Sequence, residues 1–179
     1  MKLFLAIDLP SAAKKSLNEQ LQSWQEEYRA FNWVREENFY IILHSFGEVV
    51  QKDNITEKIK EVLFDQVNFH LYAIRLDFFM DQQITIYVDF RKEQKLQNLY
   101  DTLGVAFPSK QKGIIVPHVA VARCRIPSKQ QYFVIKKKIE RSNIDLSFQV
   151  KEVVLFENIL INKKPSNKKV MAFPLVKTA

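Results

Sequence analysis

One histidine stands inside a segment that otherwise has the pattern of a buried strand. His118 lies within residues 115–123, where branched apolar residues alternate with small ones, and Ala120 leaves open space on its face. An imidazole titrates near neutral pH, so it can act as a general acid or a general base. The alternative interpretation is a core histidine whose ring is satisfied by a backbone carbonyl group.

Arg123 lies five residues after His118 and is a candidate for binding a substrate. Strict alternation places the two side chains on opposite faces of the strand, which would make Arg123 an ordinary surface arginine. A β-bulge between them would turn Arg123 to the face of the histidine. We expect His70 to be structural and Cys124 to be a small buried hydrophobic residue.

The counts of three residue types exclude several classes of protein. Three histidines and one cysteine are a poor set of zinc ligands, and a single cysteine cannot form an internal disulfide. Glycines occur only at positions 47, 104 and 113, so the chain cannot contain a glycine-rich phosphate loop or a dinucleotide fingerprint. We therefore expect no cofactor, no metal, and a reducing, cytoplasmic location.

The length and the net charge of the chain further limit the classes of protein that fit the sequence. The 179 residues are enough for one domain, and no uncharged stretch is long enough to span a membrane. A net charge of +7 favours contact with a polyanion such as RNA, although a solvated lysine-rich surface gives the same count. We expect a soluble monomer.

Hydrophobic periodicity predicts the elements that position these residues. Alternating apolar residues predict strands at 2–9, 32–35, 38–46, 67–77, 84–90, 115–124, 146–156 and 170–176. Spacings of three and four predict helices at 11–29, 53–63, 96–103 and 127–139, the third of them stopped by Gly104.

The order strand, helix, strand, helix, strand occurs twice, over residues 2–77 and 84–156. We interpret this as an internal repeat that forms two lobes of one domain, 1–179, with 157–179 closing the sheet. The predicted fold class is α+β: a bilobal, pseudo-twofold duplication of β-α-β-α-β units, with two antiparallel-rich sheets that face a central cleft. The strand of Tyr40 is then equivalent to the strand of His118, and both would point into the cleft.

Short motifs distributed along nearly the whole chain match one family in order and spacing. They are Leu3-Phe4-Leu5-Ala6-Ile7-Asp8-Leu9-Pro10, Trp33-Val34, Glu37-Asn38-Phe39, Phe46-Gly47-Glu48-Val49, Pro117-His118, Ala122-Arg123 and Ala172-Phe173-Pro174-Leu175. With them the sequence resembles the two-histidine phosphoesterases, specifically the LigT-like RNA 2′,3′-cyclic phosphodiesterases long labelled 2′-5′ RNA ligases.

The resemblance implies a metal-free mechanism with one motif in each lobe. Each motif supplies a histidine and, two residues later, a Thr or Ser on the same strand face. One imidazole activates water and the other protonates the departing ribose oxygen, while the hydroxyls donate to the phosphoryl oxygens. This sequence departs from the pattern at three of four positions: Tyr40 replaces the first histidine, Ile42 the first hydroxyl residue and Ala120 the second.

Three functions remain open. The first is a protein of this fold with lost or reduced activity that binds an RNA end or nucleotide carrying a 2′,3′-cyclic phosphate or a phosphate group. The second is an active cyclic phosphodiesterase in which His118 is the base and Tyr40 or His44 is its partner. The third is a non-catalytic scaffold for protein interaction.

His44 is a candidate partner of His118 because strict alternation places it on the same strand face as Tyr40, roughly 13 Å further along the strand. Tyr40 can serve only as an acid, since a phenol with a pKa near 10 is a poor base at neutral pH. The expected catalytic residues are His118 and Tyr40, and the expected substrate-binding residues are Arg123, His44, Ile42 and Ala120.

Overall fold

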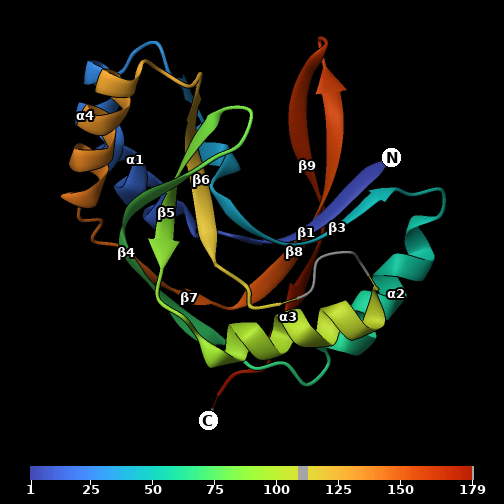
Figure 1. The fold of residues 1–179 in the computed structure, drawn as a ribbon. Helices are drawn as coiled ribbons and strands as arrows, with labels where there is room; N and C mark the ends of the chain where they lie inside the picture. Colours follow the sequence, from blue (N-terminus) through green and yellow to red (C-terminus); the bar gives the residue numbers. More distant parts are fainter. Residues whose placement is uncertain (109–112, 179) are drawn as a thin grey trace.

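Two antiparallel sheets form the centre of the molecule (Figure 1). The computed structural model describes residues 1–108 and 113–178. The first sheet has the order β3 (Tyr40–Glu48), β1 (Lys2–Asp8), β8 (Glu152–Ile161), β9 (Lys164–Pro174). The second has the order β2 (Asn32–Trp33), β6 (His118–Cys124), β5 (Ile84–Phe90), β4 (Phe69–Met80), β7 (Ser147–Val150). The predicted fold class, α+β with two antiparallel sheets, is confirmed.

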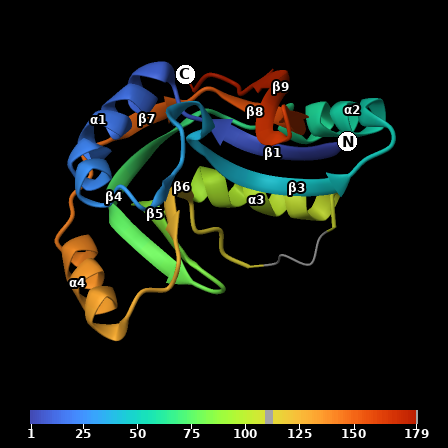
Figure 2. The ribbon, with the colours of Figure 1, turned by 90° about the horizontal axis from the view of Figure 1, so that it is seen from above.

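The helices pack on the outer sides of the two sheets (Figures 1 and 2). They are α1 (Ser11–Glu27), α2 (Lys52–Leu63), α3 (Gln94–Ala106) and α4 (Lys129–Glu140), with a 3₁₀ turn, η1 (Glu36–Asn38), before β3. Helices α2 and α3 lie against the first sheet, whereas α1 and α4 lie beside the second. Within the described residues, no helix combines the length and the apolar character needed to cross a membrane.

Strand β5 shows how alternation sets the two faces of a sheet. Ile84, Ile86 and Val88 are buried in the main core, because their face is covered by helices. Thr85, Tyr87 and Asp89 occupy the opposite face. The polar and aromatic residues of the central strands are therefore directed to the inner side of the molecule.

Several predicted boundaries are corrected by the structure. The single strand predicted at 146–156 is two strands, β7 and β8, in different sheets. Strand β9 begins at Lys164 and pairs with β8 in a long hairpin, which the prediction of 170–176 missed. Helix α3 continues through Gly104 to Ala106, and β6 begins only after Pro117, whose nitrogen cannot donate to a ladder.

Sheet membership also crosses the boundaries of the two predicted repeats. Strand β4 lies in the first predicted lobe, yet it belongs to the second sheet. The cause is its tight connection to β5: the turn at 81–83, closed by the Asp81 N–H donating to the Gln83 carbonyl, joins the two strands as antiparallel neighbours. Each sheet thus combines strands from both halves of the sequence.

Candidate functional site

A cavity of about 400 Å³ is lined by residues of both sheets. Its wall contains five of the six site residues expected from the sequence. They are Tyr40 and Ile42 from β3, and His118, Ala120 and Arg123 from β6. Val34, Asn38, Phe79 and Thr85 complete the lining.

A β-bulge in β6 brings Arg123 to the cavity. In the pairing of β6 with β5, Ala120 and Ala122 face consecutive residues and Val121 has no partner. The bulge reverses the alternation, so Arg123 reaches the face of His118. The freed carbonyl of Val121 accepts a hydrogen bond of 2.8 Å from the Val34 N–H, which satisfies the unpaired backbone.

A second bulge in β3 turns His44 away from the cavity, so the predicted position of His44 is wrong. Leu43 lies unpaired between Ile42 and His44 in the pairing with β1, and the alternation reverses as it does in β6. His44 is 9% exposed, and its ring packs on Phe46 and Phe107, with centroid distances of 4.7 and 5.7 Å. It belongs to the core beneath α3.

Burial lowers the pKa of His44 below its ordinary value. The folded protein therefore takes up this proton at a lower pH than the unfolded chain, whose histidine titrates near 6.5. We expect the free energy of unfolding to fall as pH drops below about 6.5, and to fall less in His44→Phe. Urea unfolding at pH 7.5, 6.5 and 5.5 measures this. An equal loss in both proteins would contradict it.

His118 combines a backbone contact with a place in the cavity wall. Its Nδ1 lies 2.9 Å from the Val116 carbonyl oxygen, and since a carbonyl only accepts, Nδ1 carries the proton. In the neutral ring Nε2 is then free to accept a proton. The ring packs on Tyr87 and Phe79, with centroid distances of 5.2 and 6.1 Å. His118 thus makes the contact with a backbone carbonyl that the alternative interpretation, a core histidine, predicted. Its side chain nevertheless also lines the cavity.

The carboxyl group of Asp89 lies beside His118, to which it is paired in the β5–β6 register. Burial, with a smaller contribution from Asp77, raises the pKa of Asp89, while Arg75 and His118 act in the opposite direction. Burial is therefore the main cause of the raised pKa of Asp89.

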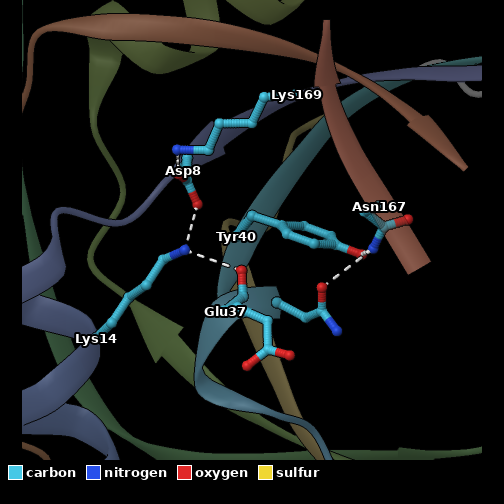
Figure 3. Close-up of polar contacts among 7 residues, drawn as sticks. Asp8, Lys14, Glu37, Tyr40, Asn167 and Lys169 are labelled. Atoms are coloured by element: carbon cyan, nitrogen blue, oxygen red, sulfur yellow. Dashed lines mark hydrogen bonds and ion pairs between the residues drawn. The ribbon is translucent and has the colours of Figure 1, made fainter.

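Tyr40 is held by an amide from the β8–β9 hairpin (Figure 3). The Asn167 Nδ2 group donates to the Tyr40 hydroxyl oxygen at 2.9 Å, and it also lies 3.3 Å from Asn38 Oδ1. The Tyr40 ring packs on Phe4 and Phe156, with centroid distances of 5.2 and 5.5 Å.

The pKa of Tyr40 is raised above its ordinary value, chiefly by burial, while the Asn167 hydrogen bond and the charge of Arg123 oppose the rise. The phenol therefore keeps its proton at neutral pH. Because Asn167 occupies the oxygen as a donor, the phenolic O–H remains available to donate. Tyr40 is suited to the role of an acid or a hydrogen-bond donor and unsuited to that of a base.

Sequence reasoning missed Thr85 and Asn167. Thr85 is the β5 partner of Arg123 and lines the cavity, so a hydroxyl and a guanidinium lie side by side on the second sheet. The alternation of apolar and polar residues in β5 predicted the strand face on which Thr85 lies, but it did not show that this face lines a cavity. Asn167 had no local signal, because it reaches Tyr40 only through the hairpin.

A charged cluster fixes the first sheet around Tyr40 (Figure 3). Asp8, the β1 partner of Tyr40, forms ion pairs with Lys14 at 2.7 Å and Lys169 at 2.5 Å. Lys14 also donates to the Glu37 carbonyl at 2.9 Å. Both lysines form ion pairs with Asp8, whereas Arg123 forms no ion pair with another described residue. Arg123 is therefore the cation of the cavity wall that is available to an anion.

The chemistry of the site follows from these groups. The cavity offers one free guanidinium, hydroxyls from Tyr40 and Thr85, and an imidazole that can accept a proton. Among residues 1–108 and 113–178, no three His, Cys, Asp or Glu side chains are grouped in a way that could hold a metal ion. The arrangement suits a small oxyanion such as a phosphate group.

Comparison with solved structures defines the class of fold. A protein of Thermus thermophilus has a TM-score of 0.74 at 18% identity, over 98% of each chain. Escherichia coli LigT complexed with 3′-AMP has a TM-score of 0.74 at 17% identity, over 97% of each chain. Kluyveromyces marxianus Usb1 has a TM-score of 0.58 at 12% identity, over 97% of each chain. The chain has a LigT-like fold. No family model and no curated protein matches its sequence.

Proposed function

We propose that this protein binds a phosphate-bearing RNA end or nucleotide in the cavity between its sheets, with little or no cyclic phosphodiesterase activity. The observation that carries the proposal is the position of Arg123. The bulge at Val121 turns this guanidinium into the same cavity as His118 and Tyr40. A guanidinium can hold two phosphate oxygens at once, and such charge-assisted hydrogen bonds are roughly twice as strong as neutral ones.

The residues around Arg123 complete a site for an oxyanion. The Thr85 hydroxyl and the protonated Tyr40 phenol are both donors in the cavity wall. Solved structures of LigT with 3′-AMP and with phosphate support this class of ligand for a cavity in the same fold. The net charge of +7 supports RNA as the source of the phosphate.

Loss of activity is proposed from what the cavity lacks. Ile42 and Ala120 line the wall where the family pattern has hydroxyl donors, and removing one donor to a developing charge lowers a rate by roughly 10² to 10³. Tyr40 cannot act as a base, so only His118 remains for that role. The site keeps groups that bind phosphate and has lost groups that stabilise its transition state.

Titration calorimetry and a turnover assay test the proposal together. We expect 3′-AMP and a 2′,3′-cyclic nucleotide to bind one site, with turnover of the cyclic nucleotide at the background rate. His118→Ala should leave the fold intact, because the ring lies at the cavity wall. Absence of binding by every phosphate ligand would refute the proposal and favour the scaffold function.

A second candidate function is an active cyclic phosphodiesterase. It is favoured by one observation: Nδ1 of His118 is occupied by the Val116 carbonyl, which leaves Nε2 as a base opposite a protonated Tyr40. Turnover that His118→Ala and Tyr40→Phe both abolish would establish it. The bulge at Leu43 and the packing of His44 on Phe46 argue against the variant of this function that used His44.

A further inference from the structure

The β8–β9 hairpin extends well past the sheet that contains Tyr40. Strands β8 and β9 pair from Glu152–Pro174 to Ile161–Lys164, whereas β1 pairs with β8 only as far as Asn158. Figure 1 shows the remainder of the hairpin standing away from the rest of the molecule. Residues 160–165 are all exposed, so this part is a two-stranded ribbon in solvent.

The hairpin is basic at its tip. Residues 157–169 contain four lysines and one glutamate. Lys163 and Lys164 lie at the turn, and neither forms an ion pair with a described residue. Cations that are unpaired and projecting attract a polyanion more strongly than the same charges paired on a flat surface.

The backbone of the turn favours a residue other than lysine. Asn162 and Lys163 have φ values of 51° and 63°, the left-handed conformation of a two-residue hairpin turn. Glycine is preferred at the second position, where a residue with a Cβ costs roughly 1–2 kcal/mol. The turn therefore holds Lys163 in a backbone conformation that glycine would adopt with less strain.

The hairpin is also connected to the cavity. The Asn158 side chain donates to Asn167 at 3.2 Å, and Asn167 donates to Tyr40 in the cavity wall. From Asn158 to Asn162 the ribbon advances by roughly 13 Å. A mononucleotide in the cavity would end short of the tip, whereas an oligonucleotide could reach it.

We propose that the hairpin tip, formed by Leu160, Ile161, Lys163 and Lys164, is a second contact surface for the single-stranded RNA whose phosphate end occupies the cavity. The inference rests on the proposed function and extends it to the substrate class. The two lysines contact backbone phosphates. Leu160 and Ile161, which are 71% and 53% exposed, offer apolar surface to the bases.

The test compares two double variants that remove the same charge. Lys163→Asn with Lys164→Gln alters the tip, and asparagine tolerates the left-handed turn. Lys136→Gln with Lys137→Gln alters α4, which lies on the other side of the molecule (Figure 1). Affinity for 3′-AMP and for a 3′-phosphorylated RNA octamer is measured over a range of NaCl concentrations.

We expect the octamer to bind the wild-type protein more tightly than 3′-AMP does. The tip variant should weaken octamer binding about five- to tenfold at low salt, and flatten the slope of log affinity against log salt by about 1 to 1.5. The α4 variant should have a much smaller effect, and 3′-AMP should bind all three proteins equally.

Equal octamer affinity in the two double variants would overturn the inference. So would an octamer that binds wild type no more tightly than 3′-AMP, which would leave the apolar tip as a contact for a protein. Failure of the proposed function has a different signature. In that case 3′-AMP would not bind, whatever the octamer does.

Discussion

Restoring the two-histidine motif should raise 2′,3′-cyclic phosphodiesterase activity by at least about 100-fold over wild type. The variant combines Tyr40→His, Ile42→Thr and Ala120→Thr, all at positions in the cavity wall. It replaces a phenol by a group that can exchange protons at neutral pH, and it adds two hydroxyl donors on the faces that already point to the cavity. Chromatography of the nucleotide products measures the rate.

The matched control carries the same three changes together with His118→Ala. If the restored activity uses both lobes, this fourth change should return the rate to background. A well-folded triple variant that binds the cyclic nucleotide but hydrolyses it no faster than wild type would contradict the assignment of these positions. Melting temperatures of both variants distinguish that result from misfolding.

Replacing Arg123 by glutamine should weaken 3′-AMP binding about 10- to 100-fold. Hydrogen bonds to charged groups contribute roughly 1.5–3 kcal/mol, and the available cation of the cavity wall would be lost. The affinity of Arg123→Lys for 3′-AMP should lie between the affinities of the wild-type protein and Arg123→Gln, because an ammonium keeps the charge but cannot form the paired hydrogen bonds of a guanidinium. Titration calorimetry at fixed salt measures all three proteins.

Arg141→Gln is the control for this change. It removes the same charge immediately after α4, far from the cavity, and should alter 3′-AMP affinity less than about twofold. If Arg123→Gln had no larger effect than Arg141→Gln, the phosphate would have to bind elsewhere. The alkyl part of Arg123 is retained largely by glutamine, so a large loss of stability is not expected.

Much of the fold could be predicted from periodicity. The alternation of Ile84, Ile86 and Val88 with Thr85 and Tyr87 fixed both the strand and its faces, since the side chains of an extended chain alternate whatever lies beside them. The pattern also predicted that Tyr40 and His118 would point into one cleft, and the two residues line one cavity.

The prediction failed where one segment forms two strands that belong to different sheets. Apolar residues recur along 146–156, so the segment was predicted as a single strand, but the chain leaves the second sheet at Val150 and enters the first at Glu152. The charged pair Lys151-Glu152 lies at that change, but it does not show which sheet each part joins. Strand β7 pairs with β4 and strand β8 pairs with β1, and both of these partners lie more than 60 residues away in the chain.

The amino-acid sequence by itself determined the antiparallel α+β class, the apolar faces and the residue types at positions 40, 42 and 120, which differ from the pattern of the family that the sequence resembles. Only the tertiary structure decided which polar groups share the cavity. The bulge at Val121 brought Arg123 in, the bulge at Leu43 turned His44 out, and the hairpin delivered Asn167 to Tyr40. Alternation is a property of one strand, whereas a bulge depends on its register with neighbouring strands from distant parts of the chain.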